Sequence, residues 1–138
     1  MNQESNKYYL AELFLRVWLG AALISHSIFK LFNPEIMLQM SLTVEKLGFP
    51  FQLIFAYLAK GSEFFGGILL ILGLFTRFAS FFIFITMFVA FYSAHKLEIF
   101  GDGELAFTYF IISIYFLING SKKYSIDNHF KMKELHEL

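Results

Sequence analysis

Four apolar windows, each about long enough to cross a bilayer, constrain this sequence more than any other feature. They cover about residues 10–32, 51–75, 77–95 and 104–120. An α-helix rises ~1.5 Å per residue, so roughly 20 residues span the hydrocarbon core. The composition agrees, because 57% of the residues are hydrophobic, 20% are aromatic and the mean hydropathy is +0.60. We therefore predict that most of the chain lies in a lipid bilayer.

Turn signals separate the windows and indicate where each helix begins or ends. They are Asn33-Pro34, Gly48-Phe49-Pro50, Thr76-Arg77 and Gly101-Asp102-Gly103. The window 77–95 is rich in Phe and β-branched residues, but its long apolar run does not alternate as a strand would. Helices also satisfy their backbone polar groups internally, which a membrane requires. We predict one domain over residues 1–138, an all-α integral membrane four-helix antiparallel bundle with a short polar tail at 121–138.

Four spans place both termini on one face of the membrane, and the basic residues are unevenly divided between the two faces. The face with the termini has Lys7, Arg77, Lys122, Lys123, Lys131 and Lys133, whereas the other has Lys30, Lys46 and Lys96. The excess predicts cytoplasmic N and C termini. The start, "MNQESNKYY", is polar and mixed in charge, unlike a signal peptide, so we expect the first helix to remain.

Two opposite charges, Lys60 and Glu63, lie inside the window 51–75. At ~100° per residue they share one side of the helix with small residues that let a neighbouring helix approach closely: Gly66, Gly67 and Gly73. We therefore expect Glu63 to point into the bundle. Its distance from Arg77 along the helix axis, about 21 Å, puts it in the outer half of the membrane.

The other polar residues in the windows fall into two predicted layers. The outer layer contains His26, Lys30, Lys60, Glu63, His95 and Glu104, and the inner layer contains Arg16, Arg77, Asn119 and Asp127. A charge in the membrane centre costs at least ~2.5–3.5 kcal/mol, so these groups must be paired, neutralised or hydrated. One interpretation is a structural network of ion pairs, Glu12–Arg16 and Lys60–Glu63. The other is a polar pocket around Glu63, His26, Lys30 and Glu104.

Several classes of chemistry are disfavoured. The sequence has no cysteine, which excludes thiol–disulfide chemistry and cysteine-ligated zinc or iron–sulfur centres. His26 and His95 would suffice as axial ligands of a b-type haem, but no HxxxH, HExxH or carboxylate–histidine helix motif accompanies them. We predict no metal and no covalent cofactor. The basic residues are divided between two faces, so nucleic-acid binding is not expected.

Six stretches, in this order and spacing, resemble the DoxX/DoxD family of small bacterial membrane proteins. They are "LRVWLGAALISHSIFKLF", "LGFPF", "KGSEFFGGILLILGLFTRFAS", "MFVAFYSAHK", "GDGELAF" and "INGSKKYSID". The resemblance runs from about Leu10 to Asn128. One departure is Ser27, where the family commonly has a glycine after the histidine.

The resemblance implies a four-helix fold in the bacterial cytoplasmic (inner) membrane. It also implies polar and glycine positions shared with the family: Arg16, Lys30, Glu63, Gly66, Gly67, Arg77, Glu104 and Asp127. Named members of the family are linked to thiosulfate:quinone oxidoreductase, to terminal quinol oxidases and to membrane complexes that manage oxidative stress. Quinone-linked redox chemistry is therefore the activity that the resemblance implies.

Three hypotheses follow. The first is a subunit of a quinone-linked membrane redox system, which holds a quinone or similar amphiphile in an outer polar pocket and needs a redox partner subunit. His26, Lys30 or Lys60 would donate hydrogen bonds, and Glu63 and Glu104 would relay protons. The second is a non-catalytic assembly or scaffold subunit. The third is a small proton-coupled transporter, which with four short helices would require a homo-oligomer.

Overall fold

The computed structural model describes residues 3–94 and 99–137, and within these ranges it contains helices and no strand. The elements are α1 (Gln3–Leu31), α2 (Pro34–Lys46), α3 (Gln52–Leu72), α4 (Thr76–Val89), the π-helical turn η1 (Ala90–Ala94), α5 (Glu104–Asn119) and α6 (Ile126–Glu137). The prediction of an all-α fold is confirmed.

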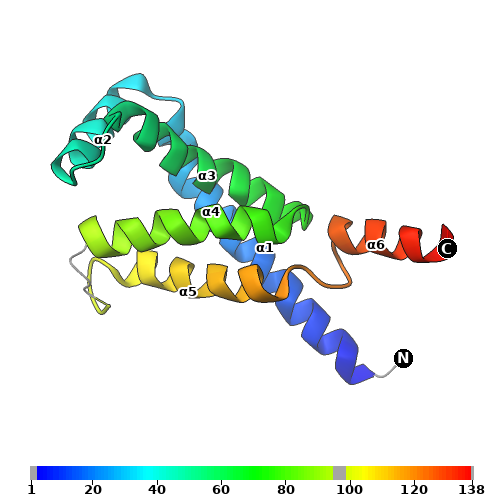
Figure 1. The fold of residues 1–138 in the computed structure, drawn as a ribbon. Helices are drawn as coiled ribbons and strands as arrows, with labels where there is room; N and C mark the ends of the chain where they lie inside the picture. Colours follow the sequence, from blue (N-terminus) through cyan, green and yellow to red (C-terminus); the bar gives the residue numbers. More distant parts are fainter. Residues whose placement is uncertain (1–2, 95–98, 138) are drawn as a thin grey trace.

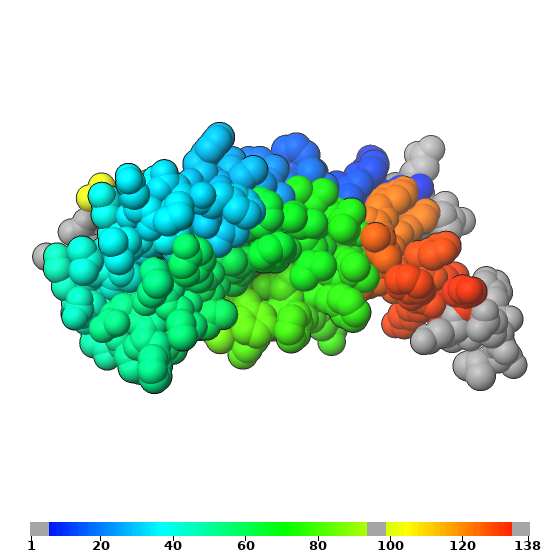
Figure 2. Space-filling view, turned by 90° about the horizontal axis from the view of Figure 1, so that it is seen from above, coloured from blue at the N-terminus to red at the C-terminus, as the bar shows by residue number. Residues whose placement is uncertain are grey.

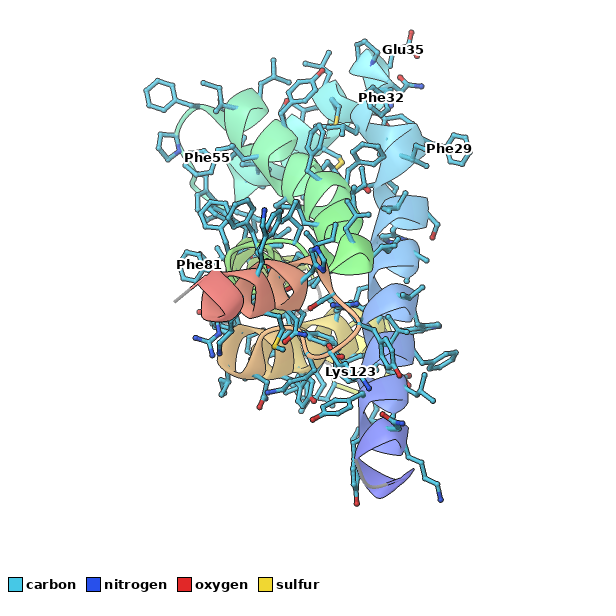
Figure 3. All side chains as sticks on the ribbon, turned by 90° about the vertical axis from the view of Figure 1, so that its right-hand side faces the viewer. Phe29, Phe32, Glu35, Phe55, Phe81 and Lys123 are labelled. Atoms are coloured by element: carbon cyan, nitrogen blue, oxygen red, sulfur yellow. The ribbon has the colours of Figure 1, made fainter. Side chains whose placement is uncertain are left out.

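Three segments are long and apolar enough to cross a membrane: Asn6–Leu31, Gln52–Leu72 and Thr76–Ser93. α5 is equally apolar in character but has only 16 residues, fewer than a typical span of about 20. Large apolar side chains cover the outside of these helices, among them Phe29 and Phe81, which project away from the ribbon in Figure 3. Such an apolar exterior is what lipid contact requires.

The long helices pack as two pairs that cross each other (Figure 1). α1 lies along α3, α4 lies along α5, and α3 also contacts α4. Both termini and α6 lie at one end of the molecule, whereas α2 and residues 99–103, which precede α5, lie at the other (Figure 1). The buried core at the crossing consists of Leu19, Leu23, Leu70, Ile83, Met87, Tyr109 and Phe116.

Glycines bring α3 close to two neighbours. A Cβ atom added to Gly20 of α1 would lie 2.6 Å from the carbonyl oxygen of Gly67, so the two backbones touch at this point. A Cβ added to Gly66 would lie 3.0 Å from Ile83 of α4. Gly73 has a different role from Gly66 and Gly67, because it ends α3 in the left-handed conformation, with φ of 63°.

Two helices lie where no helix was predicted. α2 follows Asn33, whose side-chain oxygen accepts hydrogen bonds from the amides of Glu35 and Ile36 at 3.0 and 3.3 Å. Asn33-Pro34 therefore starts a helix as well as stopping the preceding one, since Asn at the N-cap and Pro in the first turn both favour helix initiation. α6 occupies much of the predicted polar tail, 121–138.

Some predicted helix boundaries also differ. α1 begins well before residue 10, since the polar N-terminal residues continue the helix. α3 ends at Leu72 rather than at residue 75, because Gly73 terminates it. The window 77–95 contains α4 and then the π-helical turn, and its last residue, His95, lies outside the described residues.

Candidate functional site

Lys60 and Glu63 form a buried ion pair on α3. The Lys60 Nζ atom lies 2.6 Å from both carboxylate oxygens of Glu63, and the two residues are only 6% and 3% exposed. Among the side chains that the structure describes, this is the one ion pair. Each charge thus has its partner one helical turn away, which offsets much of the cost of burial.

The remaining residues of the predicted outer pocket do not enclose this pair. Lys30 and His26 of α1 lie within electrostatic reach of it, but His26 is exposed and Lys30 is half-buried. Glu104 is exposed in the first turn of α5. The three cavities described below have other linings. The structure therefore joins Lys60 to Glu63, with Lys30 and His26 nearby, and leaves Glu104 at the surface.

An apolar groove of about 570 Å³ runs between α3 and α4. Figure 2 shows the face on which α2, α3 and α4 are visible, with a hollow between α3 and α4. The lining is almost entirely apolar or small: Leu53, Ile54, Tyr57, Leu58, Gly61, Ser62, Phe65, Gly66, Leu69, Phe78, Ala79 and Phe82. Many of these side chains are exposed, so the groove opens sideways, toward the region that lipid would occupy.

A second, smaller cavity of about 290 Å³ adjoins the groove and lies between α2, α3 and α4. The two cavities share Leu58, Ser62 and Phe82. The smaller cavity, called the chamber below, is lined by Val44, Leu47, Phe49, Phe55, Leu58, Ala59, Ser62, Phe82, Ile85, Thr86 and Val89. The groove and the chamber are therefore adjacent, and α2 closes one side of the chamber.

Two hydroxyl groups lie at the junction of groove and chamber. Ser62 Oγ of α3 lies 2.7 Å from Thr86 Oγ1 of α4, and Ser62 also donates a hydrogen bond to the carbonyl of Ala59 at 2.8 Å. Because the Ser62 proton is directed to Ala59, the Thr86 hydroxyl donates to Ser62. These are polar groups in an otherwise apolar space.

The shape of α3 explains why the space exists. At Gly66 the helix is in contact with Ile83 of α4, whereas at Gly61 an added Cβ would meet nothing within 4 Å. α3 therefore diverges from α4 toward its N-terminus, and Gly61 leaves the widening gap unfilled. Sequence reasoning missed this site, because apolar residues carry no chemical signal and the gap depends on the position of α2. The one local signal was Gly61-Ser62 within an apolar window.

The predicted inner layer lies at the end of the molecule that carries both termini. A buried Arg16 donates a hydrogen bond to the carbonyl of Tyr124, and its guanidinium lies so close to Gly73 that a Cβ added there would clash with it. Arg77 donates to the carbonyl of Ile118, and Asn119 donates to that of Tyr115.

The predicted ion pair between Glu12 and Arg16 does not form, although both side chains are buried on α1.

Asp127 of α6 caps the start of α4. Its carboxylate accepts hydrogen bonds from the amides of Phe75 at 2.7 Å and Thr76 at 3.0 Å, and from the Ser121 hydroxyl at 3.2 Å. Partial burial acts to raise the pKa of Asp127, but these hydrogen bonds outweigh it and hold the pKa below its ordinary value. α4 has no side-chain cap of its own, so a residue some fifty positions away supplies one.

Comparison with known proteins finds a matching family model and a similar bacterial protein. The DoxX family model matches residues 11–96, which is more than half of the chain. A protein of Haemophilus influenzae described as uncharacterized is 34% identical over 133 residues, covering 91% of this chain and 93% of that protein. No solved structure matches the chain.

Proposed function

Because the chain belongs to the DoxX family and is an integral membrane protein, we propose that it binds a quinone or a similar amphiphile as a subunit of a membrane redox system. The observation that carries this proposal is the pair of adjoining apolar cavities between α2, α3 and α4, with the Ser62 and Thr86 hydroxyls where they meet. Ligand sites commonly combine such an apolar lining with few polar groups.

The two cavities suit the two parts of an amphiphile. The groove opens sideways, so a lipid-soluble molecule enters from the bilayer and leaves its isoprenoid tail along α3 and α4. The chamber then receives the ring. A quinone carbonyl is an acceptor, and the hydroxyl of Thr86 becomes a donor to it by turning away from Ser62. At ~1.5 Å per residue, Thr86 lies about 15 Å from the start of α4, near the middle of a bilayer.

This proposal moves the ligand away from the pocket predicted around Glu63. On α3, Gly67 faces α1 and Gly66 faces α4. The ion pair lies on the Gly67 side of the helix, and the groove lies on the Gly66 side. Neither charged residue lines the groove or the chamber. We assign the Lys60–Glu63 pair the role of holding α3 in position.

The proposed redox role includes a second protein. The sequence contains no cysteine, so neither thiol chemistry nor a cysteine-ligated cluster can come from this chain. We propose that a redox partner subunit exchanges electrons with the bound quinone. We further propose that α5 completes a four-span bundle and that both termini face the cytoplasm of a bacterium, with the protein in the inner membrane.

Substitutions of Gly61 test ligand binding. Gly61→Phe fills the groove, whereas Gly61→Ala adds one methyl group in open space and serves as the matched control. The protein is purified from membranes in mild detergent, and the extracted ubiquinone and menaquinone are quantified by chromatography. We expect quinone with the parent and Gly61→Ala proteins and a large loss with Gly61→Phe at an unchanged melting temperature. Equal quinone content in all three proteins would contradict the proposal.

A second candidate function is a non-catalytic assembly subunit, which the closed Lys60–Glu63 pair favours because it leaves neither of these two buried charges free for chemistry. The two candidates differ in one measurement. An assembly subunit would co-purify with its partner in the Gly61→Phe variant and would contain no quinone in any variant.

A further inference from the structure

A basic cavity of about 490 Å³ lies at the end of the molecule that carries both termini, apart from the groove. Four cations line it, from three parts of the chain: Arg77 at the start of α4, Lys122 and Lys123 in the α5–α6 connection, and Lys131 on α6. Figure 3 looks onto this end and shows Lys123 beside α1. Asp127 supplies the one carboxylate in the lining.

That one carboxylate can balance only one of the four cations, and its bonds are to neutral groups. Both of its oxygens accept hydrogen bonds from the Phe75 and Thr76 amides, and the Ser121 hydroxyl adds a third. Among the described side chains, none of the four cations forms an ion pair with an acid. The cavity therefore keeps an excess of positive charge at neutral pH.

Two of the cations are held in place by neutral partners. Lys123 donates to the side-chain oxygen of Asn6 at 3.2 Å and lies 5.5 Å from the centre of the Tyr124 ring. Arg77 uses one guanidinium nitrogen to donate to the Ile118 carbonyl at 3.0 Å, which leaves other N–H groups for a ligand. Neutral anchors fix the position of a charge and leave it uncompensated, as an anion site requires.

We propose that this cavity binds a phosphate group, carried by the headgroup of an anionic phospholipid or by a free solute. A planar guanidinium and nearby ammonium groups are suited to phosphate oxygens. The cavity is next to the first residues of α4 and the last residue of α5, so it lies where the apolar helices end. Basic pockets at this level bind anionic headgroups. This inference rests on observations independent of the proposed quinone site.

Removal of two lysines tests the proposal. Lys122→Gln/Lys131→Gln removes two charges from the cavity, and Lys7→Gln, an exposed lysine near the same end but outside the lining, is the control. Binding to the full chain in neutral detergent is titrated with phosphatidylglycerol, phosphatidylcholine and inorganic phosphate, using native mass spectrometry and competition. We expect saturable binding of phosphatidylglycerol over phosphatidylcholine. Near a membrane surface each lysine contributes roughly a fivefold effect, so the double variant is expected to bind at least about tenfold more weakly.

The separate titrations distinguish the source of the phosphate. Preference for phosphatidylglycerol would identify the ligand as a lipid headgroup, and binding of inorganic phosphate alone would identify it as a free solute. Either result supports the site if the double variant binds that ligand more weakly. The proposal is wrong if neither probe binds, or if Lys7→Gln weakens binding as much as the double variant does. A melting temperature that matches the parent protein shows that the double variant is folded.

Discussion

Lys60 and Glu63 neutralise each other inside the protein, with the lysine nitrogen 2.6 Å from both carboxylate oxygens. For a buried pair of this kind, removing one charge is expected to destabilise the protein more than removing both. Glu63→Gln leaves a buried ammonium without a counter-charge, and we expect it to lower the free energy of unfolding by about 3–5 kcal/mol. The melting temperature in detergent measures the loss.

The double substitution Lys60→Met/Glu63→Leu is the control for this prediction. It replaces both charges with apolar side chains of similar size, so we expect it to recover most of the stability lost in Glu63→Gln. If the double variant is as unstable as the single one, the pair does not act as a mutually neutralised unit.

The contact between Gly20 and Gly67 predicts a steric effect that depends on position. Gly67→Ala places a Cβ 2.7 Å from the backbone oxygen of Gly20, so α1 and α3 must separate and the protein is destabilised. Gly61→Ala is the matched control, because the same methyl group meets open space there. Alanine is the better helix former by roughly 0.5–1 kcal/mol, so Gly61→Ala is expected to leave the melting temperature unchanged or raise it. Equal effects of the two substitutions would refute the close helix contact.

Asp127 predicts a pH-dependent contribution to stability. Its folded-state pKa is below the ordinary aspartate value of about 3.9, so its contribution is fully present above that value and is lost as pH falls through the lower folded-state pKa. Asp127→Ala removes the cap of α4 and is expected to cost about 0.5–2 kcal/mol at neutral pH.

The difference in melting temperature between the parent protein and Asp127→Ala, measured at neutral pH and near pH 3, checks this prediction. We expect the difference to shrink in acid. Asp127→Asn, which keeps one acceptor oxygen but cannot titrate, should show a smaller loss at neutral pH. A difference that stays constant or grows in acid would be inconsistent with the assigned role.

The role proposed for Thr86 predicts a specific loss of quinone affinity when its hydroxyl is removed. Thr86→Val keeps the side-chain shape and removes the hydroxyl at the junction of groove and chamber. One hydrogen bond contributes about 0.5–1.5 kcal/mol, so the dissociation constant should rise roughly twofold to twelvefold. Thr108→Val on α5 is the control, because that hydroxyl bonds to the Glu104 carbonyl outside both cavities. Quinone titration in detergent measures both, and equal affinities would count against the assigned contact.

Sequence patterns predicted the parts of the fold that depend on local composition. The apolar windows located α1, α3, α4 and α5, because hydropathy over about 20 residues reports burial in lipid directly. α2 was missed although Asn33-Pro34 has the form of a helix start, because that pair was interpreted only as a stop signal. α6 was missed because its residues are mostly polar and show little apolar periodicity.

The candidate site was harder to predict, because it depends on contacts between distant residues. The helical spacing of Lys60 and Glu63 predicted that they share a face, and the structure pairs them. The groove, in contrast, forms where α3 diverges from α4 beneath α2, and no local sequence pattern predicts the angle between α3 and α4. The cap from Asp127 joins residues about fifty positions apart, so its role could not follow from spacing.

Mapping a bound quinone tests the central claim most directly. The purified protein, reconstituted in lipid, is labelled with a photoreactive quinone, and the modified residues are identified by mass spectrometry after competition with unlabelled quinone. The proposed site predicts competed labelling on α3 between Leu53 and Phe65 and on α4 between Phe78 and Val89, with loss of that labelling in Gly61→Phe. Labelling confined to α1 or α5, or labelling that unlabelled quinone does not reduce, would contradict it.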